Sequence, residues 1–199
     1  MIYKNKDFSK YFFDNIERVS NLIDKNQLNN LVKGLLKVKK DKGRIFFLGV
    51  GGSAGNCSHA VNDFRKLCNL ESYTPIDNVS ELTARINDEG WENSFKDWLI
   101  ASNLNKSDVL FIFSVGGGNK EKNVSTNLIK AIDLAVQKKS KIFGIVGRKD
   151  GYLAKKGNCV IIMPTVEKNL LTPLTESYQA VIWHFLVSHP DLKENKTKW

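Results

Sequence analysis

Four short apolar runs, each followed by glycine, proline or a polar turn, place the strongest constraint on how this chain folds. They lie at residues 44–50, 108–114, 141–147 and 158–163. Continuous apolar runs of this length are typical of strands that are buried on both faces. Helical patterns separate the runs, and two parallel strands need a crossover of about a dozen residues or more. The sequence therefore predicts an α/β fold with a doubly wound parallel sheet.

Helices are predicted where apolar residues recur at three- and four-residue steps. Two such helices open the chain, with their apolar positions within 8–23 and 28–38. The remaining helical patterns lie at 54–67, 81–86, 95–102, 124–137 and 176–187.

The length of the chain and its even composition predict a single domain. It has 199 residues, of which 42% are hydrophobic, and we find no internal repeat, low-complexity segment or linker. One core serves about 100–200 residues. We expect one domain over residues 1–199, in which 1–42 form the N-terminal helices, 43–190 form the α/β core and 191–199 form a polar, frayed tail.

Two observations favour a cytoplasmic protein that does not enter a membrane. The chain has no run of about 18 apolar residues, and its first residues lack the apolar core of a secretory signal. The three cysteines, Cys57, Cys68 and Cys159, show no CxxC spacing, so we expect reduced structural thiols.

The net charge of +9 does not by itself indicate nucleic-acid binding. The 30 Lys and Arg residues are spread along the chain and alternate with acids, as at 39–42 and 120–122. A basic protein also attracts anionic metabolites such as sugar phosphates. We therefore expect a small anionic ligand and no nucleic-acid partner.

Two glycine-rich loops follow the predicted strands at 44–50 and 108–114. The first is Gly49-Val-Gly-Gly-Ser53, and the second is Ser114-Val-Gly-Gly-Gly-Asn119. Glycine lets backbone N–H groups approach an anion at a helix N-terminus, and Ser53 is expected to cap the helix while donating its hydroxyl. The simpler alternative is that the glycines only turn the chain after a strand.

The loops do not match the patterns of nucleotide-binding proteins. A dinucleotide fingerprint needs G-x-G-x-x-G, and the segment 49–54 fails at its last position. No Lys-Ser or Lys-Thr pair completes a P-loop. We therefore expect a smaller phosphate ester and no nucleotide cofactor.

Histidines and carboxylates form a second candidate cluster. His59 and Asp63 lie four residues apart, so they share one helix face. Glu176 and His184 lie on another predicted helix, about 12 Å apart along its axis. To share one metal, Glu176 has to lie at the start of the helix, or different subunits have to contribute. Taken alone, His59 and Asp63 could also be an ordinary pair on the protein surface. His184 taken alone could be a histidine of the core.

The segment 49–63 resembles the phosphoheptose isomerases, which are sugar isomerase (SIS) proteins. That family has Gly-Asn-Gly-Gly-Ser, a histidine six residues on and a glutamate four further on. Matching motifs follow in order at 87–88, in the loop from Ser114, at Gly147 and at His184. The resemblance implies the SIS fold, a flavodoxin-like three-layer sandwich with two N-terminal helices used for oligomerisation. It also implies a homotetramer with active sites between subunits.

The resemblance assigns roles to individual residues. The metal-contacting positions of the family, with one zinc per subunit, fall on His59, Asp63, Glu176 and His184. Its substrate-contacting positions fall on Val50, Gly51, Gly52, Ser53, Asp63, Asn87, Asp88, Ser114, Val115, Gly116, Asn119 and Glu176. Asp63 is the expected base and His184 the expected acid; alternatively, a metal polarises the substrate oxygens.

The implied reaction converts sedoheptulose 7-phosphate into glycero-manno-heptose 7-phosphate through an enediol. The chain departs from the family at Val50, at Val115-Gly116, at Asp63 and at Glu176, where the family has Asn, hydroxyl residues, Glu and Gln. These changes leave two alternatives open. One is an isomerase of a different phosphorylated sugar, and the other is a non-catalytic SIS module that binds a sugar phosphate or a protein partner.

Overall fold

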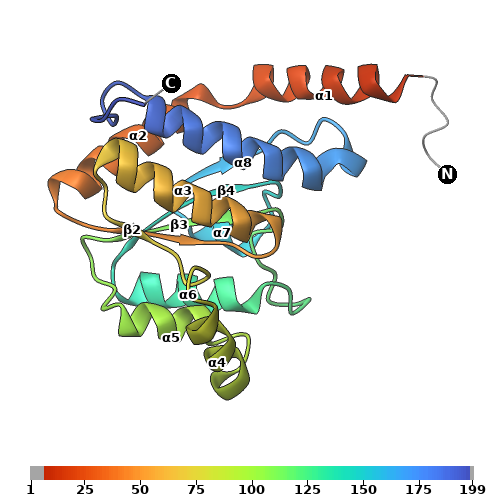
Figure 1. Cartoon of the computed structure of the whole chain (residues 1–199). Helices are drawn as coiled ribbons and strands as arrows, with labels where there is room; N and C mark the ends of the chain where they lie inside the picture. Colours follow the sequence, from red (N-terminus) through yellow and green to blue (C-terminus); the bar gives the residue numbers. More distant parts are fainter. Residues whose placement is uncertain (1–6, 198–199) are drawn as a thin grey trace.

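The computed structural model describes residues 7–197, and its centre is a parallel β-sheet (Figure 1). The sheet has five strands in the order β2-β1-β3-β4-β5, and every neighbouring pair is parallel. The strands are β1 (Ile45–Leu48), β2 (Ser72–Tyr73), β3 (Val109–Ser114), β4 (Lys141–Val146) and β5 (Cys159–Ile162). The predicted α/β class and parallel sheet are confirmed.

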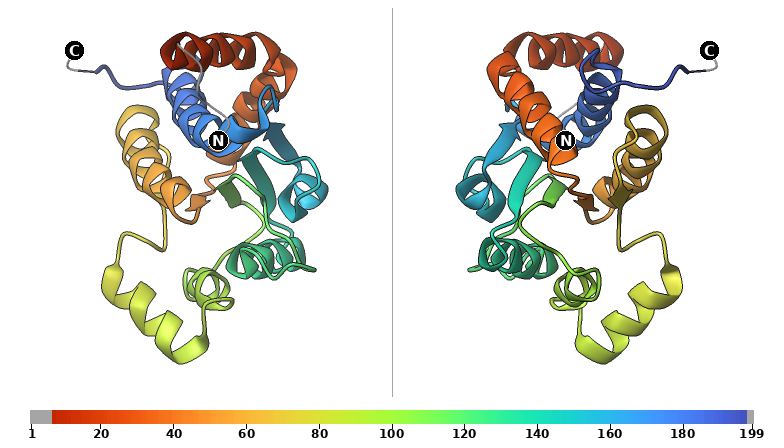
Figure 2. Two further views of the ribbon diagram at one scale, coloured as in Figure 1. Left: turned by 90° about the vertical axis from the view of Figure 1, so that its right-hand side faces the viewer. Right: turned by 90° about the vertical axis from the view of Figure 1, so that its left-hand side faces the viewer.

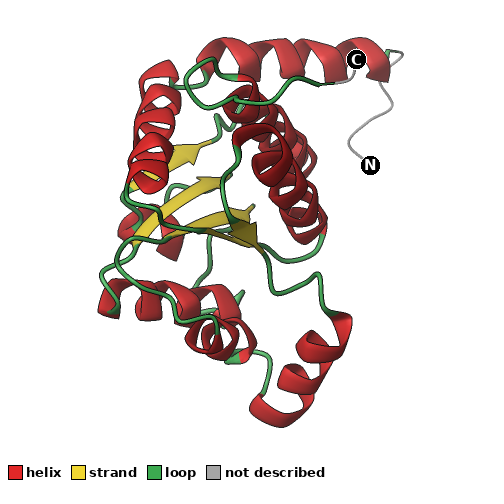
Figure 3. Cartoon of the chain, turned by 60° about the vertical axis from the view of Figure 1, so that its left-hand side comes forward, coloured by secondary structure: helices red, strands yellow, loops and turns green. Residues whose placement is uncertain are grey.

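Helices cover both faces of the sheet, which gives three layers (Figure 2). One face is covered by α2 (Lys25–Lys40), α3 (Gly52–Cys68) and α8 (Leu171–Ser188), with α1 (Phe8–Leu22) lying across them. The other face is covered by α5 (Ser94–Ala101), α6 (Thr126–Gln137) and α7 (Tyr152–Lys156). Helix α4 (Val79–Glu89) projects beyond α5, and a short 3₁₀ helix, η1 (Lys168–Leu170), precedes α8 (Figure 3).

Two apolar cores explain why the strands read as continuous apolar runs. In β1, Ile45 and Phe47 pack with α3 and α8, whereas Phe46 and Leu48 pack with α5 and α6. Successive side chains of a strand point to opposite faces of the sheet. Because both faces are covered, every position of β1 is apolar and no polar residues alternate with the apolar ones.

Helix α8 begins earlier than the sequence pattern predicts. We expected it to start at 176, but it starts at Leu171 and contains Pro173 in its first turn. Proline is tolerated there because the first N–H groups of a helix have no intrahelical partner. Glu176 therefore lies more than one turn inside the helix.

The segment 191–197 differs from the frayed tail that we expected. Leu192 is fully buried, and the backbone N–H groups of Glu194 and Asn195 donate to the carbonyl of Leu67 at 2.8 and 3.0 Å. The side chain of Glu194 also pairs with Lys39. These contacts hold the segment against the end of α3, and the last two residues of the predicted tail lie outside the described residues.

The three cysteines are free and buried, in agreement with the sequence. Burial raises the pKa of the Cys57 and Cys159 thiols, and it raises the pKa of Cys68 to about 11. Within residues 7–197, we find no helix with the length and apolarity needed to cross a bilayer.

Candidate active site

The strand order fixes where a ligand site is expected. Order 2-1-3-4-5 is that of flavodoxin-like sheets, in which the chain reverses direction across the sheet between β1 and β3. Ligands of such folds bind beyond the carboxyl ends of the strands at this switch point. Because β1 and β3 are neighbours, the two glycine loops that follow them meet there.

The first glycine loop is held by close backbone packing. A Cβ on Gly49 would lie 2.6 Å from the carbonyl oxygen of Ser53, so the loop closes only with glycine at this position. Gly51, with φ of 63°, is the residue that precedes α3. The expectation that Ser53 caps the helix was wrong. Its hydroxyl is buried and accepts a hydrogen bond from Nε2 of Gln179 at 3.0 Å.

The second glycine loop is closed by Ser114. Its hydroxyl accepts a hydrogen bond from the N–H of Gly117 at 2.9 Å, inside a turn in which Gly117 and Gly118 have φ of 71° and 84°. The carbonyl of Val115 accepts from the N–H of Gly147 at 2.9 Å. The loop is therefore tied to the end of β4.

A small cavity lies against the second loop, and its wall holds charged side chains of both signs. Its volume is about 140 Å³, and Gly116, Asn119, Lys122 and Arg148 contribute to its wall. The Arg148 guanidinium forms a 2.8 Å ion pair with Asp150 and lowers the pKa of that carboxyl to about 2. Asp150 also lines the cavity and offsets the charge of Arg148, so Lys122 is the cation that gives this cavity the character of an anion site.

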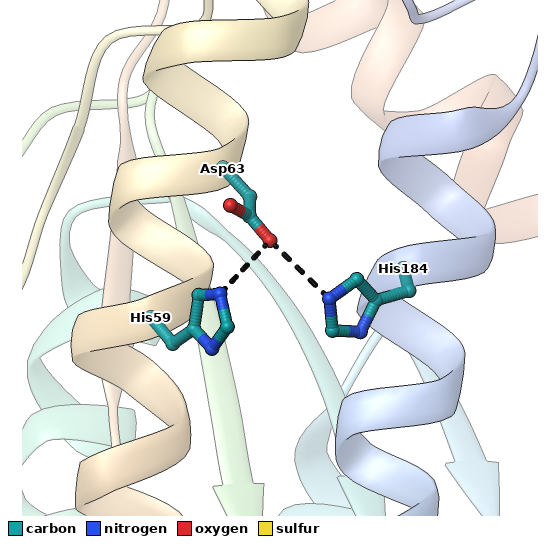
Figure 4. Close-up of side chains that lie close together, drawn as sticks. All are labelled: His59, Asp63 and His184. Carbon is teal, nitrogen blue, oxygen red and sulfur yellow. Dashed lines mark ion pairs between the residues drawn. The ribbon is translucent and has the colours of Figure 1, made fainter. Parts of the chain in front are cut away.

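Two imidazoles and one carboxylate meet between α3 and α8 (Figure 4). Oδ2 of Asp63 lies 3.5 Å from Nε2 of His59 and 3.6 Å from Nε2 of His184. One ligand atom from each residue lies within 4.8 Å of the other two. Asp63 is buried, while the two histidine side chains are 56% and 52% exposed, so the cluster opens to solvent from one side.

A hydrogen bond of the His184 ring determines which of its two nitrogens faces the cluster. Nδ1 of His184 lies 2.8 Å from the carbonyl oxygen of Ala180, which can only accept a hydrogen bond. Nδ1 therefore carries a proton, and Nε2 is the nitrogen that faces Asp63. A proton or a cation between Nε2 of His184 and the carboxylate would favour this close approach.

Two of the three separations within the cluster match those around a divalent metal, and the third is within 4.8 Å. Tetrahedral zinc with bonds of about 2.0–2.2 Å needs ligand atoms about 3.4 Å apart. The two separations from Oδ2 of Asp63, 3.5 and 3.6 Å, are close to this value. Two imidazoles and a carboxylate are also ligands that zinc uses in catalytic sites.

Comparisons with known proteins point to one family. No family model matches the chain. It is 30% identical to the lincomycin biosynthesis protein LmbN of Streptomyces lincolnensis over 152 residues. This alignment covers 71% of this chain and 54% of LmbN, so the chain spans about half the length of that protein. It is 27% identical over 164 residues to the phosphoheptose isomerase of Helicobacter pylori, covering 80% of each.

A solved structure agrees with the sequence matches. The phosphoheptose isomerase of Neisseria gonorrhoeae superposes with a TM-score of 0.76 at 20% identity, covering 90% of this chain and 94% of that one. The chain is similar to phosphoheptose isomerases in sequence, and it shares their fold. The resemblance read from the sequence is thereby confirmed.

Glu176 of this phosphoheptose isomerase-like protein does not join the cluster of His59, Asp63 and His184. Eight residues separate it from His184, about 12 Å along α8. Its carboxylate lies at the first glycine loop instead, because a Cβ on Gly52 would fall 2.6 Å from its Oε2. Within the described chain, Glu176 is therefore beside the expected substrate loop and apart from the three metal-ligand candidates.

Asn87 and Asp88 also lie apart from the cluster. Both are exposed on the last turns of α4, where Nδ2 of Asn87 donates to Oδ1 of Asp88 at 2.7 Å. Helix α4 projects away from α3 and α8 in all the views (Figures 1 and 2). Within residues 7–197 of one copy, we find no hydrogen bond or ion pair between these two residues and the glycine loops.

Sequence reasoning missed two buried residues that assemble the site. Gln179 is fully buried; its Nε2 donates to Ser53, and its Oε1 accepts from Asn56 at 2.8 Å, which ties α8 to the first turns of α3. Trp183 donates from its indole N–H to Oδ2 of Asp63 at 3.1 Å. The available signal was a glutamine followed four residues later by a tryptophan, a spacing that places both on one face of the helix.

Proposed function

We propose that this protein is a sugar-phosphate isomerase that interconverts a ketose and an aldose. The expected pair is sedoheptulose 7-phosphate and glycero-manno-heptose 7-phosphate. One observation carries the proposal: His59, Asp63 and His184 gather between α3 and α8, and α3 begins at the end of the first glycine loop at the switch point of the sheet. The similarity to proteins named phosphoheptose isomerase supports an isomerase.

The spacing of the two parts suits a phosphorylated sugar. Seven residues of α3 separate Gly52 from His59, about 10 Å of helix rise. An extended sugar phosphate can bridge this span, with its phosphate at the glycine loops and its carbonyl end at the cluster. Lys122 of the small cavity offers positive charge to a phosphate where Val115 and Gly116 lack hydroxyl groups. Arg148 would add to it by exchanging its partner Asp150 for the phosphate.

Proton transfer between adjacent carbons is assigned to Asp63. Its carboxylate is buried and faces solvent only on the side of the two imidazoles, so a substrate entering there meets the base directly. His184, whose Nε2 lies 3.6 Å from that carboxylate, is positioned to exchange a proton with the substrate oxygen. Alternatively, a zinc ion held by His59, Asp63 and His184 would supply Lewis-acid polarisation of the substrate oxygens.

A homo-oligomer with sites between subunits is part of the proposal. His59 and His184 are more than half exposed in the single chain, and Asn87 and Asp88 lie away from the cluster. Exposed apolar residues on α1, Phe13 at 65% and Leu22 at 61%, suit a contact between copies. We expect a homotetramer, which light scattering on a sizing column measures directly.

A panel of ketose and aldose phosphates, each incubated with zinc-loaded protein and read by NMR, tests the function. We expect conversion of a seven-carbon ketose phosphate and slower or no conversion of shorter sugars. Conversion of a different phosphorylated sugar would support the proposed isomerase activity but replace the proposed substrate.

A non-catalytic binding module is the second candidate, because Val50, Val115 and Gly116 depart from the family in the loops that contact substrate. Metal analysis separates the two functions. Near-stoichiometric metal together with turnover supports catalysis. Binding of sugar phosphates by calorimetry, with no metal and no turnover, would replace the isomerase with a binding module.

A further inference from the structure

Trp183 stands directly behind the cluster of metal-ligand candidates. It is 2% exposed, and its ring centroid lies 4.9 Å from that of His184 and 5.2 Å from that of His59. On its other side, the indole stacks on Phe113 of β3 at 6.1 Å and 18°. The tryptophan thus fills the space between the sheet and the cluster.

The indole N–H makes one polar contact, and it is with the shared carboxylate. Nε1 of Trp183 donates to Oδ2 of Asp63 at 3.1 Å, and this is the oxygen that faces both imidazoles. The other oxygen, Oδ1, accepts from Nδ2 of Asn62 at 3.0 Å. Each carboxylate oxygen therefore has its own N–H donor, which fixes the rotation of the side chain.

The length of Asp63 makes this restraint important. Aspartate is one methylene shorter than the glutamate that the family pattern has at this position, so it has fewer torsions with which to reach a ligand. A carboxylate oxygen has lone pairs for two partners, so the indole N–H leaves one lone pair of Oδ2 for a metal. Partners of this kind orient metal ligands and are typically as important as the ligands themselves.

A purely structural role for Trp183 is the competing explanation, since a buried indole stacked on Phe113 contributes to the core whatever its N–H does. The two explanations differ in what they assign to the N–H. Packing requires only the ring, whereas orientation of Asp63 requires the donor. A change that removes the N–H and keeps a ring separates them.

We infer that Trp183 is a positioning residue for a divalent metal, acting through its indole N–H on Oδ2 of Asp63. The inference rests on the proposed metal cluster and not on the identity of the sugar. It assigns to Trp183 no contact with the substrate and no proton transfer.

The test is zinc affinity, measured by competition with a chelating dye, for Trp183→Phe against the wild type. We expect affinity to fall by about 10- to 100-fold, the usual cost of losing a partner of a metal ligand. Trp98→Phe is the matched control, because Trp98 packs edge-on against Phe46 in the other core. It should bind zinc as the wild type does.

A double-mutant cycle identifies the route of the effect. In an Asp63→Ala background, Trp183→Phe should cause no further loss of zinc affinity, because its partner is already gone. An equal loss in both backgrounds would overturn the inference. If Trp183→Phe does not fold, as judged by circular dichroism, the isosteric Trp183→benzothienylalanine replaces it, since sulfur takes the place of the N–H and the volume is kept.

The remaining outcomes separate this inference from the proposed function. Unchanged zinc affinity in the folded variant overturns the role of Trp183 and leaves the isomerase standing. A wild-type protein that binds no divalent metal overturns the metal cluster and this inference together, while sugar-phosphate turnover is judged by the substrate panel alone.

Discussion

Nε2 of His184, on the last helix, lies 3.6 Å from Oδ2 of Asp63, on the helix that leaves the first strand. Gln179 of α8 joins the same two helices, because its Nε2 donates to Ser53 and its Oε1 accepts from Asn56. The cluster therefore depends on how α3 and α8 dock, and each of its members can be changed without touching the sheet.

Asp63→Asn keeps the shape of the side chain and removes its basicity. We expect isomerase turnover to fall by at least about 100-fold, the lower end of what a positioned general base contributes. The far-ultraviolet circular dichroism should remain that of the wild type, because the amide can still accept the hydrogen bond from Trp183. Full activity in this variant would remove Asp63 from the mechanism.

His184→Gln should weaken zinc binding and reduce turnover together. The imidazole nitrogen that faces Asp63 is lost, while the side chain remains polar and about half exposed, so folding should be little affected. We expect losses of about 10-fold or more in metal affinity. His189→Gln is the control, since His189 is the residue that follows α8 and pairs with Asp191 instead of the cluster. Equal losses in the two variants would contradict the assignment.

Gly49→Ala tests the closure of the first glycine loop. The added Cβ would lie 2.6 Å from the backbone oxygen of Ser53, which cannot move without opening the first turn of α3. We expect a loss of about 1–3 kcal/mol in the free energy of unfolding, measured with urea. Gly55→Ala meets nothing within 4 Å and lies inside α3, so it should instead gain about 0.5–1 kcal/mol. Equal stability of both variants would show that the loop is not closed in this way.

The cysteines should resist alkylation in the folded protein. All three are buried, and burial raises the pKa of Cys68 to about 11, so almost no reactive thiolate is present near pH 8. Mass spectrometry after iodoacetamide treatment should show unmodified chain without denaturant and three modified sites in its presence. Rapid labelling of native Cys57 or Cys68 would mean that the core between α3 and α8 opens readily.

The sheet could be predicted from the sequence because its strands are buried on both faces. Runs such as 108–114 have no other explanation of comparable strength, and the structure places β3 within that run. β2 escaped prediction because two residues, Ser72 and Tyr73, carry no periodic signal. Helix α7, with five residues, escaped for the same reason.

The candidate site could be predicted only in part. The spacing of His59 and Asp63 predicts that they share one helix face. The order of the family motifs along the chain predicts that His184 belongs to the same site. What could not be predicted was the tertiary partner of each group. Ser53 lost its expected capping role because the buried amide of Gln179 reaches its hydroxyl, and that contact spans two helices that are distant in the sequence.

Solvent exchange at the substrate carbon tests the account most directly. Zinc-loaded protein is incubated with sedoheptulose 7-phosphate in deuterium oxide, and the carbon next to the carbonyl is followed by NMR. The account predicts that wild-type protein introduces deuterium there while the aldose forms, and that Asp63→Asn introduces none. Exchange that is undiminished in Asp63→Asn, or absent from metal-loaded wild type with every sugar phosphate tried, would contradict it.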